Sequence, residues 1–561
     1  MESERVGEYL IRRLTELGIR HIFGIPGDYV LGFYDLLSRS ADLEVINTSD
    51  EQGAGFAADA YARVKGLGAV CVTYGVGALK IANSTAQAYA EKSPVVVISG
   101  APGIAEQQQR QLLHHQITDY GMQKRVFEEF TVAATVIDTP ETAREEIDRV
   151  LAAALHFKRP VYIELPRDQV FALCPPQRKP PIKQEKSDPA ALQEAIEEAV
   201  GLINAARQPV ILAGVEIHRF GLQKELCQLA RAKGIPAAAT ILAKSVIADT
   251  EKFYMGIYEG ATGLEEVRSY VESSDCLLLL GAFLTDMDLG LFTANIDPST
   301  SIYATSERIS IRHHRFDSVL FHDFIKGLLK AAIVPRKLQG TPRPRAPKPF
   351  LHGSDKKITV ASLFEQVNAF LDTTTMVVAD IGDALFGAND LYLHHSTSFL
   401  SPAFYASLGF AVPGALGAQL ASPKVRPLVL VGDGAFQMTG MEISTIARCG
   451  LNPIIIVLNN QGYSTERPML DGPYNDVHPW HFSKIPSVIG TGIGFIIETE
   501  VDLEQALLTA RKNTDSFTII DVKLDKHDRS PALTRLTKKL GEKVQSAPSG
   551  RTTGHSGNKQ H

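Results

Sequence analysis

The chain has 561 residues, of which 44% are hydrophobic and 21% charged, and its formal net charge is −6. At roughly 150 residues per domain, this length predicts about three to four domains with ample apolar core. The mild negative charge, together with the lack of a long Lys/Arg run, argues against nucleic acid or a membrane surface as a partner. No stretch approaches the ~18 apolar residues that a membrane span needs.

The start of the chain and the cysteines both bear on its compartment. The first residues, MESERVGEYLIRRL, are charged and amphipathic and do not resemble the apolar core of a signal peptide. The five cysteines are far apart and never form a Cys-x-x-Cys pair, so neither a disulfide framework nor a zinc site is expected. They are Cys71, Cys174, Cys227, Cys276 and Cys449. We therefore expect a cytoplasmic protein.

The first unit, residues 1–175, alternates helical patterns with short β-rich runs. Such alternation predicts a doubly wound parallel α/β sheet. The predicted strands are His21–Gly24, Val45–Asn47, Ala69–Thr73, Val95–Ile98 and Val161–Leu165. A linker rich in proline and charge, CPPQRKPPIKQEKSDP, follows from Cys174 to Pro189.

Two further α/β units follow along the chain. The second covers 190–338, with predicted strands Pro209–Ala213 and Cys276–Leu280. It has no G-x-G-x-x-G after a strand, so a nicotinamide site is not indicated. After a second linker from Gly340 to Lys357, the third unit covers 357–545, and its rhythm is similar to that of the first. The tail 546–561 is polar, and we expect it to be disordered.

The most informative stretch lies in the third unit and reads RPLVLVGDGAFQMTGMEISTIARCGLNPIIIVLNNQGYSTE. It predicts two neighbouring parallel strands, with Asp433 and Asn460 at their carboxyl ends and the side chains of both in one crevice. A glycine turn that leads into a helix presents backbone N–H groups to a diphosphate. A carboxylate, an amide oxygen and a backbone carbonyl are ligands that Mg²⁺ prefers.

Gly432-Asp433-Gly434, then twenty-four residues, then Asn459-Asn460 resembles the thiamine diphosphate motif of the pyruvate decarboxylase superfamily. The resemblance extends over nearly the whole chain, because two similar sheets flanking a third is the architecture of these enzymes. It implies three doubly wound domains of the thiamine diphosphate-binding fold. It also implies a homodimer or homotetramer, because in this family the first and third units meet across a subunit interface.

The resemblance implies how the cofactors are held. Mg²⁺ is expected on Asp433, Asn460 and the carbonyl of Gly462. The thiamine diphosphate contacts that it implies are Glu51, Asp383, Ala406, Leu408, Asp433, Gly434, Ala435, Asn460, Gly462 and Tyr463. Two of these are open to other interpretations, because Leu408 could serve core packing and an Asp383 carboxylate beside a diphosphate is electrostatically awkward.

Glu51 opens a predicted helix, and from its position alone it could equally serve the helix dipole. The run from Ser49 to Arg63 resembles the family's Glu-x-x-Ala-x-x-Ala-Ala-Asp-x-Tyr-Ala-Arg segment. By this resemblance, Glu51 hydrogen-bonds the aminopyrimidine ring of the cofactor and promotes loss of the proton from the thiazolium C2.

Four more residues match the decarboxylase branch of the family. They are Asp28 in Gly24-Ile25-Pro26-Gly27-Asp28, the pair His114 and His115, and Glu466, which follows the Asn-Asn motif at the family spacing. The resemblance implies that they order the carboxylate of a 2-oxo acid and return a proton after CO₂ leaves. The main expectation is therefore decarboxylation of a 2-oxo acid to an aldehyde and CO₂.

The substrate and two other functions stay open at this point. The positions that match the family's acyl pocket are Met287, Ile381, Leu385, Phe386, Thr465 and either Leu536 or Thr537. They favour branched or aromatic 2-oxo acids such as indolepyruvate or phenylpyruvate, with pyruvate as a further candidate. One alternative is a carboligase similar to acetolactate synthase, whose middle domain holds a flavin. The other is a catalytically silent relative that acts as a binding subunit.

Overall fold

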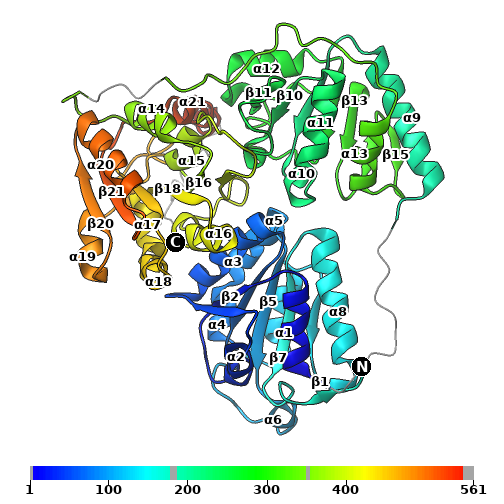
Figure 1. Cartoon of the computed structure of the whole chain (residues 1–561), viewed down its shortest axis with the longest axis vertical. Coiled ribbons are helices and arrows are strands. Elements are labelled where there is room, and N and C mark those ends of the chain that lie inside the picture. Colours follow the sequence, from blue (N-terminus) through cyan, green and yellow to red (C-terminus); the bar gives the residue numbers. More distant parts are fainter. Residues whose placement is uncertain (1–3, 177–185, 349–353, 547–561) are drawn as a thin grey trace, which may run out of the picture.

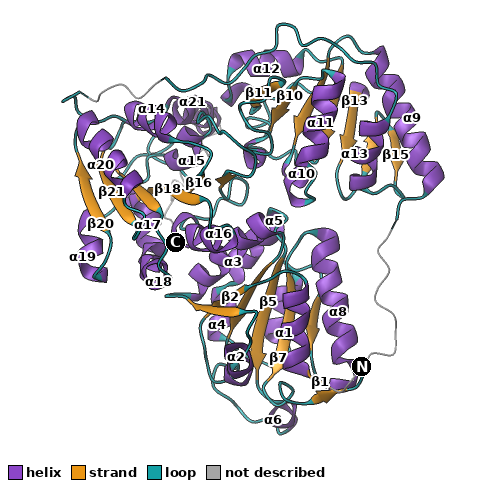
Figure 2. Ribbon diagram, in the orientation of Figure 1, coloured by secondary structure: helices purple, strands orange, loops and turns teal. Residues whose placement is uncertain are grey.

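The computed structural model describes residues 4–176, 186–348 and 354–546, with side chains up to residue 538. Three β-sheets of six, seven and six strands follow one another along the chain. In Figure 1 the N-terminal part lies at the bottom, the central part at the upper right and the C-terminal part at the upper left. Figure 2 shows helices on both faces of the sheets, as a doubly wound α/β fold requires.

The N-terminal sheet is entirely parallel, with strand order β3-β2-β4-β5-β7-β6. Its strands are β2 (His21–Gly24), β3 (Glu44–Asn47), β4 (Gly68–Val72), β5 (Val95–Ala101), β6 (Ala134–Val136) and β7 (Val161–Pro166). Its helices are α1 (Val6–Glu16), α2 (Leu31–Ser38), α3 (Glu51–Lys65), α4 (Val76–Lys80), α5 (Ala82–Ala90), α6 (Ile104–Gln108), α7 (Met122–Glu128) and α8 (Pro140–Phe157). A short antiparallel pair, β1 (Glu4–Arg5) and β8 (Leu173–Cys174), closes this part of the chain.

The central sheet has the order β11-β10-β9-β12-β13-β14-β15, and it is only partly parallel. Its last two strands run antiparallel because the turns before them are too short for a crossover helix. The strands are β9 (Pro209–Ala213), β10 (Ala237–Ala239), β11 (Tyr254–Ile257), β12 (Cys276–Leu280), β13 (Ser301–Ala304), β14 (Ile309–Ile311) and β15 (His314–Phe316). The α-helices are α9 (Pro189–Ala205), α10 (Val215–Arg219), α11 (Gln223–Lys233), α12 (Glu265–Glu272) and α13 (Phe321–Lys330).

The C-terminal sheet is parallel and has the order β17-β16-β18-β19-β21-β20. Counted within each sheet, this strand order is the same as that of the N-terminal sheet, which confirms the predicted likeness of the two units. The strands are β16 (Thr375–Ala379), β17 (Phe399–Leu400), β18 (Arg426–Gly432), β19 (Ile454–Asn459), β20 (Ile493–Ile497) and β21 (Thr518–Lys523). The α-helices are α14 (Val360–Phe370), α15 (Asp383–Ala388), α16 (Ala411–Ala421), α17 (Asp433–Thr439), α18 (Ile443–Arg448), α19 (Ile485–Ile489), α20 (Glu500–Lys512) and α21 (Pro531–Ser546).

Helices α3 and α16 join the N-terminal part to the C-terminal part (Figure 1). Both are lined by small residues, so their backbones come very close. A Cβ on Gly417 of α16 would lie 1.9 Å from the carbonyl oxygen of Ala57 in α3, which leaves room for glycine alone. The small-residue run after Glu51 is therefore a packing surface that fixes where α3 begins.

A buried ion network holds the three parts together around Arg63 of α3. Its guanidinium pairs with Asp59 and Glu91, each at 2.8 Å, and donates to the carbonyl of Ser401 in the C-terminal part. Lys92, which follows Glu91 in the chain, forms an ion pair with Glu216 of the central part at 2.6 Å. A buried charge without a partner is strongly destabilising, so these ion pairs favour one arrangement of the three parts.

The seven strands predicted by their bounds are all present, six within one residue of those bounds, while β5 continues three residues beyond the predicted end at Ile98. The sequence missed β6 and several central strands, which are short. Parts of both predicted linkers, 177–185 and 349–353, lie outside the described residues, as does the predicted tail beyond Ser546, the last residue of α21.

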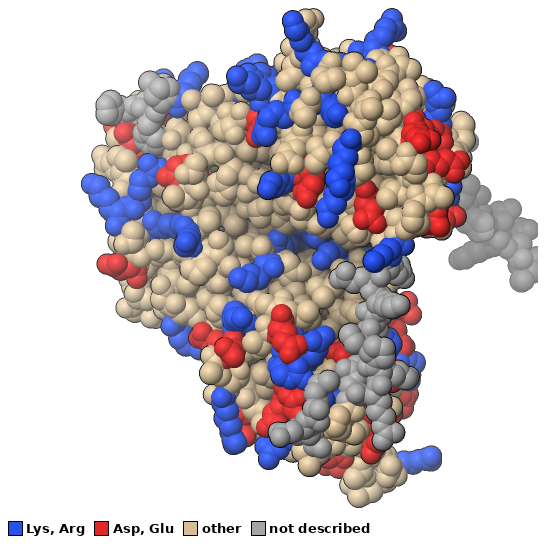
Figure 3. All heavy atoms as spheres, turned by 45° about the vertical axis from the view of Figure 1, so that its right-hand side comes forward, with Lys and Arg blue, Asp and Glu red and all other residues tan. Residues whose placement is uncertain are grey.

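In the described part of the chain, no helix is long and apolar enough to cross a membrane. Acidic and basic side chains are interspersed on the face in Figure 3.

Candidate active site

The N-terminal group of predicted residues lies in segments that follow β2, β3 and β5. Asp28 follows β2, and Glu51 is the first residue of α3, which begins after β3. His114 and His115 lie in the loop between α6 and α7. The carboxyl edge of a parallel sheet is where doubly wound folds bind ligands, so these four residues share the expected edge.

Asp28 and His114 are in direct contact. The Asp28 carboxylate lies 2.9 Å from Nε2 of His114, and Tyr29 stacks on the His114 ring with centroids 4.8 Å apart. Asp28, His114 and His115 each offer a polar atom within 4.8 Å of the others. Three groups that can hold or pass a proton are thus gathered at one point.

His115 is held in an unusual backbone conformation. Its φ is +68°, a region that residues other than glycine seldom occupy, and its Nδ1 is buried without a hydrogen-bond partner in the described part of the chain. Ala406 (φ +62°) and Gln461 (φ +59°) also have positive φ angles, and they lie in two other segments predicted to contact the cofactor. Strained backbone of this kind concentrates at functional sites, where the surrounding structure enforces it.

Glu51 is a largely buried carboxylate with a partner close by. Asp50 caps α3 by accepting the N–H of Gln52, which fixes Glu51 in the first turn. The Glu51 carboxylate lies 3.1 Å from Nζ of Lys80 in α4. A Cβ on Gly77 would come within 3.7 Å of Glu51 Oε1, so the chain after β4 runs close beside this carboxylate.

The C-terminal group forms as the sequence predicts. β18 and β19 are adjacent and parallel, with Gly432 opposite Leu458, so Asp433 and Asn460 emerge side by side. Asp433 accepts the N–H groups of Gly434 at 2.8 Å and Gln461 at 2.6 Å, which ties the two loops together.

The oxygen atoms at this point suit a divalent cation. Burial raises the pKa of Asp433 to about 6, because its effect exceeds that of the backbone N–H hydrogen bonds, which lower the pKa. No cationic side chain pairs with Asp433 in the described part of the chain. A buried carboxylate beside an amide oxygen, without a countercharge, fits Mg²⁺ held with phosphate oxygens.

Small residues allow the loops around Asp433 to pack closely. A Cβ on Gly434 would lie 2.7 Å from the ring of Tyr463, so glycine lets the two loops approach. Ala435 is buried in the first turn of α17. A Cβ on Gly462 would lie 2.3 Å from the carbonyl of Asn475, which leaves room there for glycine alone.

Glu466 is exposed and is not neutralised by its neighbour. The adjacent Arg467 instead pairs with Asp471 at 2.8 Å and Asp476 at 2.6 Å. The Glu466 backbone N–H donates to the carbonyl of Tyr463, which fixes its place in the loop after Asn460. Its carboxylate is thus free to meet a ligand or another chain.

The sequence analysis missed Asp380, which organises the predicted cofactor loop from Ala406 to Phe410. Its fully buried carboxylate accepts the N–H of Gly409 at 3.0 Å and that of Ala411 at 2.8 Å. Leu408, immediately before Gly409, is half-buried against the core. The signal was available, because Asp380 follows strand β16 as Asp433 follows β18.

Asp383 has a specific partner in the structure. One of its oxygens accepts the N–H of Ser530 at 2.9 Å, and the other is buried without a partner in the described part of the chain. Burial raises the pKa of Asp383 to about 6. The carboxylate therefore ties α15 to the segment before α21.

Most of the predicted acyl-pocket residues lie in or against the large apolar core that the central and C-terminal parts share. Met287, Ile381, Leu385, Phe386 and Leu536 belong to one apolar cluster. Thr465 lies close by, because a Cβ on Gly382 would be 3.5 Å from its hydroxyl oxygen. Thr537 is buried, and its hydroxyl donates to the carbonyl of Leu533.

The N-terminal and C-terminal groups do not meet within one chain. In the described residues, no hydrogen bond or ion pair joins Asp28, Glu51, His114 or His115 to Asp433, Asn460 or Glu466.

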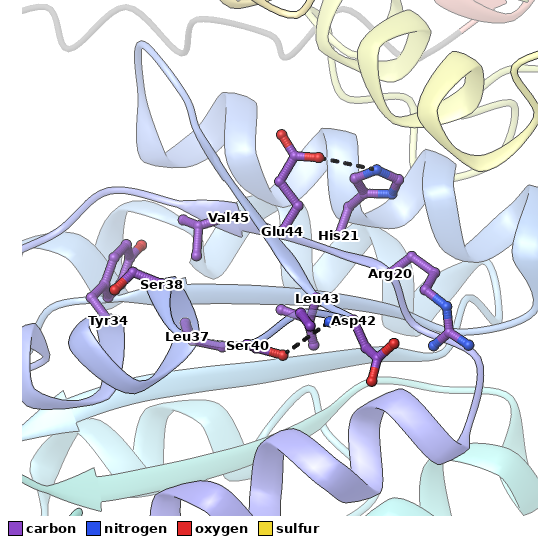
Figure 4. A pocket seen from close by; sticks show the side chains of 11 residues that line it. Arg20, His21, Tyr34, Leu37, Ser38, Ser40, Asp42, Leu43, Glu44 and Val45 are labelled. Carbon is purple, nitrogen blue, oxygen red and sulfur yellow. Dashed lines mark hydrogen bonds and ion pairs between the residues drawn. The ribbon is translucent and has the colours of Figure 1, made fainter.

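A cavity of about 550 Å³ lies at the amino ends of β2 and β3, lined by residues that include Arg20, His21 and Glu44 (Figure 4). This is the opposite end of the sheet from Asp28, so the cavity is not part of the predicted site.

Comparisons with known proteins show the family to which the three parts of the chain belong. Residues 4–123 match the N-terminal TPP-binding domain of the thiamine pyrophosphate enzymes, 196–330 their central domain and 380–522 their C-terminal TPP-binding domain. The chain is 35% identical over 536 residues to an indole-3-pyruvate decarboxylase of Azospirillum brasilense, covering 95% of this chain and 97% of that protein. It is 36% identical over 530 residues to an alpha-keto-acid decarboxylase of Mycolicibacterium paratuberculosis, covering 92% and 93%. The chain therefore belongs to the family of thiamine diphosphate-dependent 2-oxo acid decarboxylases.

Proposed function

We propose that the protein converts a 2-oxo acid to an aldehyde and CO₂ without oxidation, with thiamine diphosphate and Mg²⁺ bound. The observation that carries this proposal is the contact between Asp28 and His114, with His115 beside them. A decarboxylase that releases an aldehyde must return a proton to the substrate carbon, and this cluster can supply one.

The two ends of the cofactor are assigned to different parts of the chain. Residues 1–175 hold the aminopyrimidine ring through Glu51, and residues 357–545 hold the diphosphate, while 190–338 form the central domain. Asp433, Asn460 and the carbonyl of Gly462 would hold Mg²⁺, because they form a set of hard oxygen ligands. Bound thiamine diphosphate supplies the carbon nucleophile and takes up the electron pair left when CO₂ departs.

The chain's own residues then handle protons and orientation. The Glu51 carboxyl exchanges a proton with the ring that it hydrogen-bonds. Asp28, His114, His115 and Glu466 order the substrate carboxylate, and the same four supply the proton that completes the aldehyde. Because these groups are close and coupled, the proton belongs to the cluster and not to one member. The Ala406 carbonyl would accept a hydrogen bond from the cofactor amine, and Leu408 would pack against the cofactor.

A second copy of the chain completes the site in this proposal. Leu31, Val76 and Leu112 are exposed near the N-terminal group, and Met438 and Leu470 near the C-terminal group. Apolar side chains exposed around two unjoined half-sites suit a homodimer or homotetramer, in which the N-terminal group of one copy faces the C-terminal group of another.

The preferred substrates are branched or aromatic 2-oxo acids such as indolepyruvate or phenylpyruvate, with pyruvate as a poorer one. Met287, Ile381, Leu385 and Phe386 are apolar residues of one core cluster, and in this proposal they line a pocket that suits a side chain larger than methyl. The names of the two relatives support the same class of substrate. Five free cysteines support a reducing, cytoplasmic location.

The carboligase alternative is less well supported, because its flavin would need the central domain. A nucleotide would bind at the carboxyl ends of β9 and β12, where the strand order reverses. There, a Cβ on Gly214 would lie 2.0 Å from the carbonyl of Gly281, and the buried Glu216 pairs with Lys92. The protein's own groups fill this crevice. A silent binding subunit is disfavoured by the presence of Glu51, Asp433 and Asn460.

The proposal is tested by measuring CO₂ and aldehyde from a panel of 2-oxo acids, from pyruvate to indolepyruvate, with and without thiamine diphosphate and Mg²⁺. Aldehyde formation that needs both additives is the expected result. If pyruvate gave acetolactate and no aldehyde, the protein would be assigned as a carboligase. A yellow colour of the purified protein, from a bound flavin, would support that assignment.

A further inference from the structure

A buried polar network lies behind the two histidines of the N-terminal group. It joins α7 to strands β5 and β7, and none of its side chains takes part in the proposed chemistry. Its members are Ser99, Gln123, Tyr162 and Glu164, all at most 2% exposed.

The Gln123 amide stands at the centre of this network. Its Nε2 faces three oxygens, those of Ser99 at 2.9 Å, Tyr162 at 2.6 Å and Glu164 at 3.4 Å. Tyr162 in turn donates its hydroxyl hydrogen to the same Glu164 oxygen at 2.6 Å. Because these acceptors hold the NH₂ side of the amide, the Gln123 oxygen must point the other way.

That oxygen holds Gly75, which follows β4. The Gly75 N–H donates to Gln123 Oε1 at 2.7 Å, in a buried hydrogen bond. Gly75 has a φ of +65°, and a Cβ on it would lie 2.4 Å from the carbonyl oxygen of His115. The backbones of Gly75 and His115 are thus in contact, and both are in the left-handed region.

Glu164 itself has no cationic partner within ion-pair distance in the described part of the chain. The groups that face it are Tyr162, Gln123, Ser99 and Tyr74, with Lys124 as the nearby cation that influences it. Burial raises the pKa of Glu164 to about 7. An apolar residue would pack here without that penalty, so packing alone does not explain a carboxyl group.

We propose that Glu164 is a positioning residue for the decarboxylation: acting through Gln123, it holds Gly75 where that residue fixes His115 beside His114 and Asp28. The inference rests on the proposed function, because it needs His115 to take part in the reaction. It adds a dependence of the reaction on Glu164, Gln123 and Gly75, to which the proposed function assigns no contact with substrate or cofactor.

The test compares Glu164→Met, which fills the volume without an acceptor, with Glu164→Gln, which keeps one oxygen for Tyr162 and Gln123. Glu164→Met should lower kcat for aldehyde release by about tenfold to a hundredfold, the effect of a displaced catalytic group. Glu164→Gln should retain most of the activity, whereas a role in filling space would be met equally by Met.

A second variant guards against misfolding. Gln123→Met removes the acceptor for the Gly75 N–H, and it should lower kcat to a similar extent. The double variant should lose no more than the stronger single variant, because both act through one contact. Glu259→Met is the matched control, since Glu259 is also buried and its pKa is also raised to about 7, but it lies at the junction of the central and C-terminal parts.

Two results would overturn the inference, and they have different meanings. Full activity of Gln123→Met and Glu164→Met, alongside an inactive His115→Gln variant, removes Glu164 from the mechanism and leaves the proposed function intact. Full activity of His115→Gln removes the histidine from the reaction, and with it both the inference and the proton cluster of the proposed function.

Discussion

The carboxylate of Asp380 accepts the backbone N–H of Gly409 at 3.0 Å, and this contact links the end of β16 to the loop that carries Ala406 and Leu408. Its second oxygen accepts the N–H of Ala411 at the start of α16. One buried side chain therefore determines the course of a loop that we assign to the cofactor.

Asp380→Asn is expected to weaken binding of thiamine diphosphate about tenfold. The new NH₂ group would face the Ala411 N–H, and an unsatisfied buried donor costs about 1–3 kcal/mol. Fluorescence or calorimetric titration with the cofactor measures the change. Asp317→Asn, at an exposed ion pair with Arg315, is the control and should bind normally. Unaltered affinity in Asp380→Asn would mean that the loop keeps its shape without this carboxylate.

Glu51→Gln is expected to slow loss of the C2 proton from bound cofactor by about 10²-fold or more, since the amide cannot exchange a proton with the ring. Hydrogen/deuterium exchange at C2, followed by NMR after acid quench, measures this step directly. Lys80→Met tests the neighbouring ion pair and should leave the protein folded and able to bind cofactor. Normal exchange in Glu51→Gln would exclude this glutamate from the step.

Glu466→Gln is expected to leave C2 exchange unchanged and to lower aldehyde release about 10²-fold. The reason is that Glu466 is assigned to the substrate carbon and not to the cofactor ring. Steady-state aldehyde formation and C2 exchange, measured on one preparation, separate the two steps. Equal turnover by the variant and the wild type would leave Glu466 as a solvated loop residue.

Asp433→Asn and Asp383→Asn should differ in their response to Mg²⁺. The first variant removes a proposed ligand, so binding of thiamine diphosphate should lose its dependence on the metal and fall at least tenfold. The second alters a carboxylate that accepts from Ser530, so its cofactor binding should still be abolished by EDTA and restored by Mg²⁺. If both variants behave alike, Asp383 belongs to the cofactor site as well.

Glu259→Gln should stabilise the protein in a pH-dependent way. Burial raises the pKa of Glu259 to about 7 from its ordinary value of 4.5, so the folded state holds a proton that the unfolded state releases between these values. Stability from this group therefore falls as pH rises from about 4.5 to 7, and the loss is complete above 7. The glutamine avoids this loss and keeps an acceptor for Asn389, which donates to Glu259 at 3.1 Å. The free energies of unfolding, measured by denaturant titration, should be similar at pH 5 and should favour the variant by roughly 1–3 kcal/mol at pH 8. A constant difference across this range would show that Glu259 does not titrate on unfolding.

The sequence determined the parts of this protein that depend on local patterns. Short apolar runs such as Pro209–Ala213 and Cys276–Leu280 became strands with the expected bounds, because buried parallel strands need continuous apolar residues. The place of Asp433 and Asn460 also followed from sequence, since two consecutive strands joined by helices end at the same edge of a sheet.

Only the tertiary structure decided what depends on contacts between distant segments. The antiparallel strands β14 and β15, the hold of Asp380 on Gly409 and the link from Glu164 through Gln123 to Gly75 join residues that no periodicity relates. The resemblance implied that Glu51 and Asp433 belong to one site formed across a subunit interface, and within a single chain they lie in two separate groups. Spacing along a chain specifies which strand end a residue occupies, but the packing of one sheet against another, and of one copy against the next, determines which ends meet.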